Sequence, residues 1–151
     1  MLRERFNEAL KGAMKAKDTA TVSTVRMILA GLKDRDIAAR GKGNAEGISD
    51  TEIQQMLQSM VKQRREAMTL YEQGGRQELV EKERGEIAII EGFLPQQLDA
   101  AASEQAIRET IASVGAASVK DMGRVMTALR ERYAGQMDFG LASATVKRLL
   151  G

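Results

Sequence analysis

The sequence predicts an all-α fold, and three observations lead to that prediction. Apolar residues recur at the i, i+3, i+4 spacing of amphipathic helices. No segment alternates apolar and polar residues with a period of two, which is the pattern of a half-buried strand. Aromatic residues make up only 3% of the 151 residues, while methionine occurs nine times. Such a core suits helix packing, because strands favour aromatic and β-branched residues.

The first two helices are predicted on either side of Asp18. The segment 2–17 has a single apolar stripe, which contains Leu2, Phe6, Ala9, Leu10, Ala13 and Met14. Asp18 is a typical N-cap for a second helix over residues 19–40, because its side chain can accept a hydrogen bond from the first turn. The stripe of this helix contains Val22, Val25, Ile28, Leu29 and Leu32. Residues 41–47 hold three glycines and no large apolar side chain, which predicts an exposed loop.

The third and fourth helices are predicted between this loop and Pro95. Ser49 and Glu52 form a capping box that begins a long helix, and the glycine pair 74–75 stops it. The apolar side of this helix contains Ile53, Met56, Leu57, Met60, Val61, Met68 and Tyr71. The fourth helix covers roughly residues 76–93, with an apolar side of Leu79, Val80, Ile87 and Ile90. Pro95 is expected to end it, because proline cannot donate a backbone hydrogen bond and disfavours helical geometry at the preceding residue.

Three shorter helices are predicted after Pro95, which is the only proline of the chain. The first is stopped at Gly115, Ser118 and Asp121 form a possible cap for the second, and Asp138 caps the third. Their apolar stripes contain, in chain order, Ile107, Ile111 and Val114; Met122, Val125, Met126, Leu129 and Tyr133; and Leu141, Val146, Leu149 and Leu150.

Pro95 therefore divides the predicted fold into two domains. Residues 1–94 form a four-helix N-terminal domain, and residues 95–151 form a small three-helix C-terminal domain. The second stretch is short for an independent fold, because small domains bury a smaller share of their surface. Packing of the two domains on each other is thus the open alternative to independent folding.

The residue types that are absent exclude several kinds of site. The chain has no cysteine and no histidine, so it lacks a thiolate nucleophile, an imidazole base and the usual zinc ligands. An enzyme would depend on carboxylates, lysine or tyrosine, and catalysis by this chain alone is the least favoured reading. No cofactor is predicted. No metal is predicted either, because the glutamates of the fourth helix do not share one face; these are Glu81, Glu83, Glu86 and Glu91.

The location prediction depends on two further absences. No window approaches the roughly 18 uncharged apolar residues that a transmembrane helix needs, and no basic-then-apolar leader opens the chain. We therefore expect a cytoplasmic protein without a membrane partner.

Basic residues gather near the C-terminal end of the chain. From Lys120 onward there are six Lys or Arg residues and three Asp or Glu residues. The candidate nucleic-acid-binding residues are Lys120, Arg124, Arg130, Arg132, Lys147 and Arg148. Phosphate contacts dominate RNA affinity, and the scarcity of aromatic residues for base stacking predicts contacts to the RNA backbone. The alternative is a solvated helix face, which Asp121 and Glu131 partly neutralise.

Two other features are interpreted structurally. Lys62, Arg64 and Arg65 on the long helix are expected to form a salt-bridged surface. Gly123 is placed mid-helix, where glycine costs about 0.5–1 kcal/mol relative to alanine. A closely crossing helix would explain this glycine, and the approach of a ligand backbone is the less favoured alternative.

Two segments of the chain resemble the GatB/YqeY family. They are VKQRREAMTLYEQGGRQELVEKERGEIAIIEGFLPQQL, residues 61–98, and DMGRVMTALRERYAG, residues 121–135. The length and order are similar to those of a stand-alone YqeY-like protein, and the resemblance covers nearly the whole chain. Its most specific positions are Gly75-Arg76 with Leu79 and Glu83, Leu94-Pro95 with Leu98, and Met122-Gly123 with Val125-Met126. These are turn, cap and packing positions, and none is a catalytic signature.

The resemblance implies that the chain assists an enzyme rather than catalysing the reaction by itself. It makes the C-terminal domain similar to the tail of the B subunit of the tRNA-dependent amidotransferase, a carbon–nitrogen ligase with glutamine as amido-N-donor. In that enzyme the tail contacts tRNA and amide transfer takes place in other domains. We therefore expect an accessory protein of translation that binds tRNA or another structured RNA through its C-terminal domain. The alternative is a protein-interaction module that docks on an amidotransferase or aminoacyl-tRNA synthetase subunit through an apolar groove between the domains.

Overall fold

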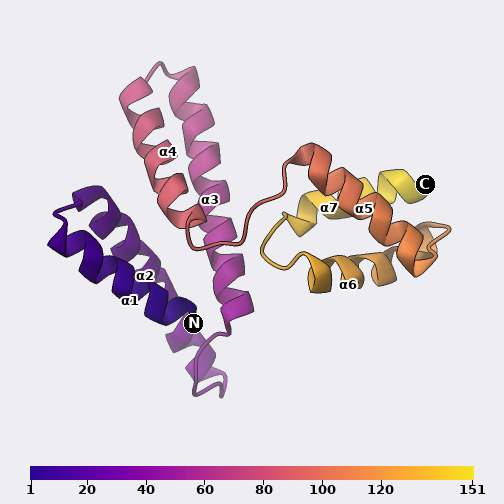
Figure 1. The fold of residues 1–151 in the computed structure, drawn as a ribbon, viewed down its shortest axis with the longest axis horizontal. Helices are drawn as coiled ribbons and strands as arrows, with labels where there is room; N and C mark the ends of the chain where they lie inside the picture. The colour runs from indigo at the N-terminus through magenta and orange to yellow at the C-terminus, as the bar shows by residue number, and fades with distance from the viewer. The chain divides into compact units, whose positions relative to one another are not determined.

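The computed structural model describes all residues 1–151, and the prediction of an all-α fold is confirmed (Figure 1). Seven α-helices and one short 3-10 helix make up the chain, with no strand. The chain divides into two compact units, Met1–Leu94 and Pro95–Gly151, which we call unit 1 and unit 2. None of the helices combines the length and the apolar character that a membrane span requires.

Unit 1 is built from two helical hairpins. Helices α1 (Leu2–Lys15) and α2 (Thr19–Gly41) form the first, and α3 (Asp50–Gln73) and α4 (Gln77–Glu91) form the second (Figure 1). Helix α2 also packs against both α3 and α4, so it joins the two hairpins. The largest fully buried side chains of their shared core are Phe6, Ile28, Ile53, Met56, Leu57 and Ile90.

The helix starts of unit 1 follow the predicted caps. The carboxylate of Asp18 accepts a hydrogen bond from the Thr21 amide at 3.2 Å. The Ser49 hydroxyl accepts from the Glu52 amide at 3.2 Å, and the Glu52 carboxylate accepts from the Ser49 amide, which completes the capping box. Gly74 is the C-cap residue of α3. These predictions are confirmed because capping depends only on residues a few positions apart.

Helix α4 ends earlier than the sequence predicts. It stops at Glu91 with Gly92 as its cap, so Pro95 lies beyond the helix and does not terminate it. Phe93 instead turns into the core and packs edge-to-face on Phe6, with ring centroids 4.9 Å apart. Arg5 holds this turn, because its guanidinium donates to the Gly92 and Phe93 carbonyls at 3.0 and 3.3 Å.

The loop between α2 and α3 also differs from prediction, because part of it is buried. Asp36 of α2 is buried, and its carboxylate accepts hydrogen bonds from the Arg3 guanidinium and from the Ile48 amide. Arg3 also donates to the Ile48 carbonyl at 2.7 Å. Gly47 packs against this network with φ near +85°, and a Cβ there would overlap the Asp36 carboxylate. The loop is therefore held by this charged network together with Ile48, whose side chain is buried in the core of unit 1.

Unit 2 packs its helices around a separate core. It contains α5 (Ala100–Val114), the 3-10 helix η1 (Val119–Asp121), α6 (Met122–Arg132) and α7 (Phe139–Leu150). The three α-helices contact one another pairwise. Their fully buried apolar side chains are Ile107, Val125, Leu129 and Val146.

Two details of unit 2 correct the sequence prediction. The Ser118–Asp121 capping box is present, but it begins the 3-10 helix η1, and α6 starts only at Met122. Leu141 was predicted to be buried and is 71% exposed, whereas Ala142 is 3% exposed. Ala142 and Val146 are four residues apart and define the buried face of α7, which leaves Leu141 pointing to solvent.

Candidate nucleic-acid interface

Two of the predicted arginines meet at one end of helix α5. Arg124 donates to the Val114 carbonyl at 3.0 Å, and Arg132 donates to the Ser113 hydroxyl at 2.7 Å. The two arginines are eight residues apart on α6, so they lie about 80° apart around it and can reach the same neighbour. Lys120 lies in η1, four residues before Arg124, and is exposed. We call Lys120, Arg124 and Arg132 the α5–α6 basic surface.

The end of α5 explains why arginines gather there. The last carbonyls of a helix lack intrahelical partners and carry partial negative charge, so a guanidinium beside them is stabilised. Gly115 closes α5 in the left-handed region, with φ near +68°. The Val114 carbonyl is thereby left to accept from Arg124. Local helix chemistry thus places cations at this surface without any ligand.

One carboxylate belongs to the same surface. Asp121 accepts from the Ala117 amide at 2.8 Å and the Ser118 amide at 3.3 Å, and its other oxygen pairs with Arg124 at 3.1 Å. The backbone hydrogen bond from Ala117, followed by the Arg124 guanidinium, lowers the pKa of Asp121 below its usual value. The surface therefore carries three cations, one of which is paired with an ionised carboxylate. Glu131, seven residues after Arg124, is a second acidic residue on that side of α6.

Arg148 and Lys147 lie elsewhere on unit 2. The guanidinium of Arg148 donates to Glu104 of α5 at 2.7 Å, and Arg108 shares the same carboxylate at 3.2 Å. Arg148 and then Arg108 lower the pKa of Glu104. Glu104 precedes Ser113 by nine residues, which is about half a revolution around the helix. The Arg148–Glu104 pair therefore lies on the side of α5 opposite to Ser113. Lys147, next to Arg148 in sequence, is exposed.

Arg130 occupies a third place. Its guanidinium lies 6.0 Å from the centre of the Phe139 ring, at the start of α7. It is about 160° around α6 from Arg132. The structure thus brings together three of the six predicted residues, Lys120, Arg124 and Arg132, and distributes the others over two further places.

The explanation of Gly123 needs correction. Gly123 is the second residue of α6 and not a mid-helix residue, and it is exposed. A Cβ built there meets no atom within 4 Å, so no helix crosses closely at this point. Ser113, by contrast, was not singled out from the sequence. Its role follows only from the pairing of α6 with the end of α5.

Two of the three residues of the basic cluster of α3, Arg64 and Arg65, are salt-bridged as predicted, and their partners lie on the neighbouring helix. Arg64 pairs with Glu86 at 3.0 Å and Arg65 pairs with Glu91 at 2.7 Å, both across the α3–α4 hairpin. The Arg64 pair is the more buried of the two, with side chains 11% and 17% exposed. Burial, with the charge of Glu86 second, raises the pKa of the nearby Glu83. The two ion pairs join the helices, whereas Lys62 is exposed and forms no ion pair.

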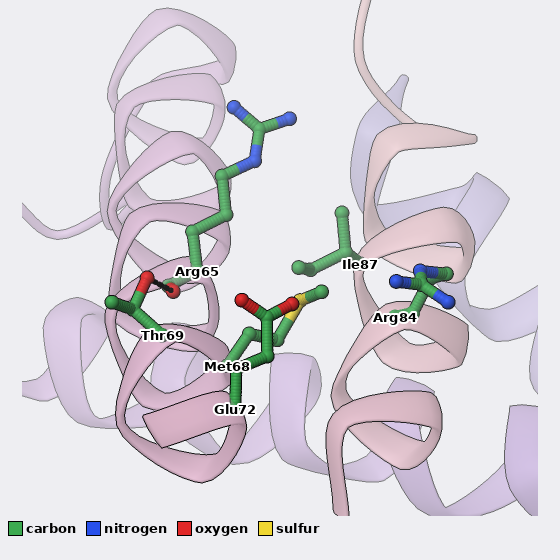
Figure 2. A pocket seen from close by; sticks show the side chains of 6 residues that line it. All are labelled: Arg65, Met68, Thr69, Glu72, Arg84 and Ile87. Carbon is green, nitrogen blue, oxygen red and sulfur yellow. Dashed lines mark hydrogen bonds between the residues drawn. The ribbon is translucent and has the colours of Figure 1, made fainter. Parts of the chain in front are cut away.

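A hollow of about 370 Å³ lies on the same hairpin. Figure 2 shows Met68 of α3 and Ile87 of α4 pointing toward each other across it, with the Glu72 carboxylate close by. Its two arginines, Arg65 and Arg84, are both paired with glutamates. No group of three or more Asp or Glu side chains is placed to hold a metal ion anywhere in the chain.

A comparison with known families bears on the whole chain. The model of a family described as Yqey-like protein matches residues 3–150. The chain belongs to the YqeY-like family. The resemblance inferred from residues 61–98 and 121–135 is therefore confirmed at the level of the family.

Curated relatives of this YqeY-like chain carry the name "Altered inheritance of mitochondria protein 41, mitochondrial". The one from Eremothecium gossypii is 33% identical over 103 residues, which cover 68% of this chain and 54% of that protein. Those from Lachancea thermotolerans and Saccharomyces cerevisiae are 33% and 32% identical over 87 residues, 58% of this chain and 44% and 45% of theirs. The chain spans about half the length of the curated relatives it matches.

These names overturn the predicted location. All three relatives are named as mitochondrial proteins, so the prediction of a cytoplasmic location is wrong. That prediction depended on the lack of a secretory leader and of a membrane span, and neither feature distinguishes mitochondrial proteins from cytoplasmic ones. The names state no RNA, substrate or partner.

Proposed function

We propose that this YqeY-like chain is an accessory protein that binds structured RNA, tRNA included, through the α5–α6 basic surface. The observation that carries the proposal is the convergence of Arg124 and Arg132 on the last turn of α5. Both side chains are exposed, and the carboxylate that pairs with Arg124 is Asp121. A surface of this charge attracts phosphate, which accounts for most of the affinity of sequence-independent RNA binding.

The present partners of these arginines are easily exchanged. Arg132 donates to a neutral hydroxyl, and Arg124 shares a surface ion pair in which its side chain is 59% exposed. Exposed ion pairs contribute little, with a median of about 0–1 kcal/mol. A guanidinium can instead bind phosphate with two parallel hydrogen bonds, which are shorter and stronger because both partners are charged. The surface can therefore accept phosphate without breaking the fold.

The proposal assigns RNA binding to residues 95–151 as a tail-like domain. Unit 2 has its own buried core, which supports treating it as a module separate from the helical domain 1–94. Membership of the YqeY-like family supports a relationship to the tail of the amidotransferase B subunit. Tyr133, the one tyrosine of unit 2, is half-buried in that core. Contacts to the RNA backbone are therefore favoured over base stacking.

The test is salt-titrated binding of the purified full chain to total tRNA. We expect dissociation constants in the micromolar range or weaker, rising steeply with salt. Reversal of charge at Arg124 and Arg132 together should weaken binding at least tenfold. The matched control reverses Arg130 and Lys147, which changes the net charge of unit 2 equally but lies outside the surface. Equal losses in the two double variants would contradict a localised site, and an unchanged affinity in the first would contradict the surface itself.

The second candidate is docking on an amidotransferase or aminoacyl-tRNA synthetase subunit. Two exposed apolar residues of unit 2 favour it, because Leu141 is 71% exposed and Val119 is 43% exposed. Such an interface would be comparatively insensitive to salt, since apolar burial is not screened. Recovery of an identified subunit of either enzyme after nuclease treatment, with no bound RNA, would favour this candidate over the first.

A further inference from the structure

An open groove runs along the first hairpin of unit 1. It has a volume of about 870 Å³ and is lined by the end of α1, the following turn and one face of α2. Met14, Val22, Met27 and Ala30 supply its apolar wall, and Lys17 and Arg26 supply its charges. Met14 is 53% exposed and Met27 is 39% exposed, which is unusual for side chains of this size. We call these six residues the α1–α2 groove.

Helix α2 carries this groove on a face of its own. The α2 residues that line it, from Thr19 to Ala30, recur at spacings of three and four and so form one stripe along the helix. The buried core face uses other positions, namely Val25, Ile28 and Leu32. The twelve residues from Thr19 to Ala30 extend about 16 Å along the helix axis, or three turns. The groove is therefore long enough to accept three turns of a second helix.

The charges of the groove have no partners within the molecule. Neither Lys17 nor Arg26 forms an ion pair or a side-chain hydrogen bond, and no carboxylate lines the groove. Asp18 is next to Lys17 in sequence, but its carboxylate accepts from the Thr21 amide and hydroxyl as the N-cap of α2. In the α3–α4 hollow of Figure 2, both arginines are paired with glutamates. The α1–α2 groove thus differs in having apolar surface together with unmatched positive charge.

We propose that the α1–α2 groove binds an acidic amphipathic helix of a protein partner. The partner would place aliphatic side chains against Met14, Met27 and Val22, and a carboxylate near Lys17 or Arg26. Methionine suits such a wall because its flexible, polarisable side chain adapts to different apolar surfaces. A helix that lays its apolar face in a groove is a recurring mode of peptide recognition, and complementary charge fixes its orientation. This site is in unit 1 and does not depend on RNA binding by unit 2.

The first experiment titrates the ¹⁵N-labelled full chain with a synthetic peptide of about 16 residues. The peptide has leucine at i, i+3, i+4, i+7 positions and glutamate on its other face. One control peptide replaces glutamate by lysine, and the other replaces leucine by glutamine. We expect the acidic amphipathic peptide to bind at least tenfold more tightly than either control, because only it matches both the apolar wall and the charge. Amide shifts should centre on Val22, Arg26, Met27 and Ala30.

Matched variants separate the groove from general charge. Arg26→Glu should weaken peptide binding at least tenfold, whereas Arg35→Glu, an exposed unpaired arginine on the same helix, should not. Met14→Glu should weaken it similarly, whereas Leu70→Glu, at a residue 67% exposed on α3, should not. Thermal unfolding followed by circular dichroism checks that each variant is folded. The double reversal at Arg124 and Arg132 should leave peptide binding unchanged, which keeps this test independent of the proposed RNA function.

Several results would overturn the proposal. Equal binding of the acidic and basic peptides, or equal losses of affinity for Arg26→Glu and Arg35→Glu, would show that the groove does not recognise the acidic peptide. Amide shifts centred on the α5–α6 basic surface would assign the peptide to unit 2. The groove would have another occupant if its amides shifted with RNA or anionic vesicles and not with the peptide. Concentration-dependent sedimentation that Met14→Glu abolishes would identify that occupant as a second copy of the chain.

Discussion

Arg3 in unit 1 and Arg132 in unit 2 have the same side chain in very different surroundings. Arg3 binds the Asp36 carboxylate and the Ile48 carbonyl, and the Asp36 side chain is only 8% exposed. Arg132 is exposed and donates to the Ser113 hydroxyl. Removing a partner from the first arrangement leaves a buried charge unsatisfied, while the second exchanges its partner with water. Arg3 thus fastens the fold of unit 1, whereas Arg132 is available to a ligand of unit 2.

The largest effect on stability is expected at Gly47. Gly47→Ala places a Cβ in the volume of the Asp36 carboxylate and requires alanine to adopt a φ near +85°. Steric strain and the displaced network together should cost about 3 kcal/mol. Urea unfolding would measure this loss, and hydrogen exchange resolved by segment should locate it in unit 1. Gly115→Ala is the control, because it shares a positive φ but meets no atom within 4 Å. An equal loss in both variants would mean that the Asp36 contact adds nothing.

The second-largest loss of stability is expected for a substitution at Asp36. Asp36→Asn keeps the shape of the side chain but removes the charge that Arg3 binds, and should cost about 2 kcal/mol at neutral pH. The Arg3 hydrogen bonds, opposed by burial and assisted by the Ile48 amide, lower the pKa of Asp36 below its usual value of 3.8. The stabilisation is therefore complete above that usual value and is lost as the pH falls through the lowered one.

The pH dependence gives this prediction its control. The difference in unfolding free energy between the natural chain and Asp36→Asn should be largest near neutral pH and should shrink below about pH 4. Urea unfolding at several pH values would measure it. A difference that stays constant down to strongly acidic pH would contradict an ionised Asp36 in the folded chain.

An intermediate effect is expected for the interhelical pair Arg64–Glu86. Its side chains are mostly buried but retain some exposure, so Arg64→Ala should cost about 1.5 kcal/mol. A double-mutant cycle with Glu86→Ala would isolate the pair, because Arg64 also donates to the Met60 carbonyl. A coupling energy near zero would show that the Arg64–Glu86 pair contributes no more to stability than an exposed ion pair does.

The smallest effect on stability is expected at Arg132. Arg132→Ala removes one exposed hydrogen bond to Ser113 and should change the unfolding free energy by less than about 0.5 kcal/mol. Thermal unfolding of the two chains side by side would measure it. A loss as large as that of Asp36→Asn would show that Arg132 fastens unit 2, and the contrast with Arg3 would then fail.

Local chemistry made much of the fold predictable. Asp18, Ser49 and Asp138 are N-caps in the structure as in the prediction, because a cap depends on residues two or three positions away. The end of α4 was missed because it depends on distant partners. Arg5 and Phe6 lie near the N-terminus of the chain, and their contacts hold Phe93 in the core of unit 1. Gly92, the cap residue of α4, is a local sign of this boundary that the prediction did not use.

The candidate site was predictable in part for the same reason. Arg124 and Arg132 share a side of α6, which helical spacing alone shows. The partners of Arg148 and Arg130 were not predictable, since Glu104 lies 44 residues before Arg148 in the chain. The buried pair Arg3–Asp36 was missed entirely, because the two residues are 33 positions apart in the chain, although Asp36 follows Leu32 by one turn on the buried face of α2.

The central claim is that exposed arginines at the end of α5 bind RNA phosphate, and the salt dependence of tRNA binding tests it most directly. The logarithm of the binding constant should fall linearly with the logarithm of the salt concentration. In Arg124→Gln/Arg132→Gln the slope should be smaller by about 1.5, because each lost phosphate contact removes roughly 0.7–0.9. Identical slopes for the natural chain and this double variant would show that neither arginine contacts phosphate, and would contradict the account.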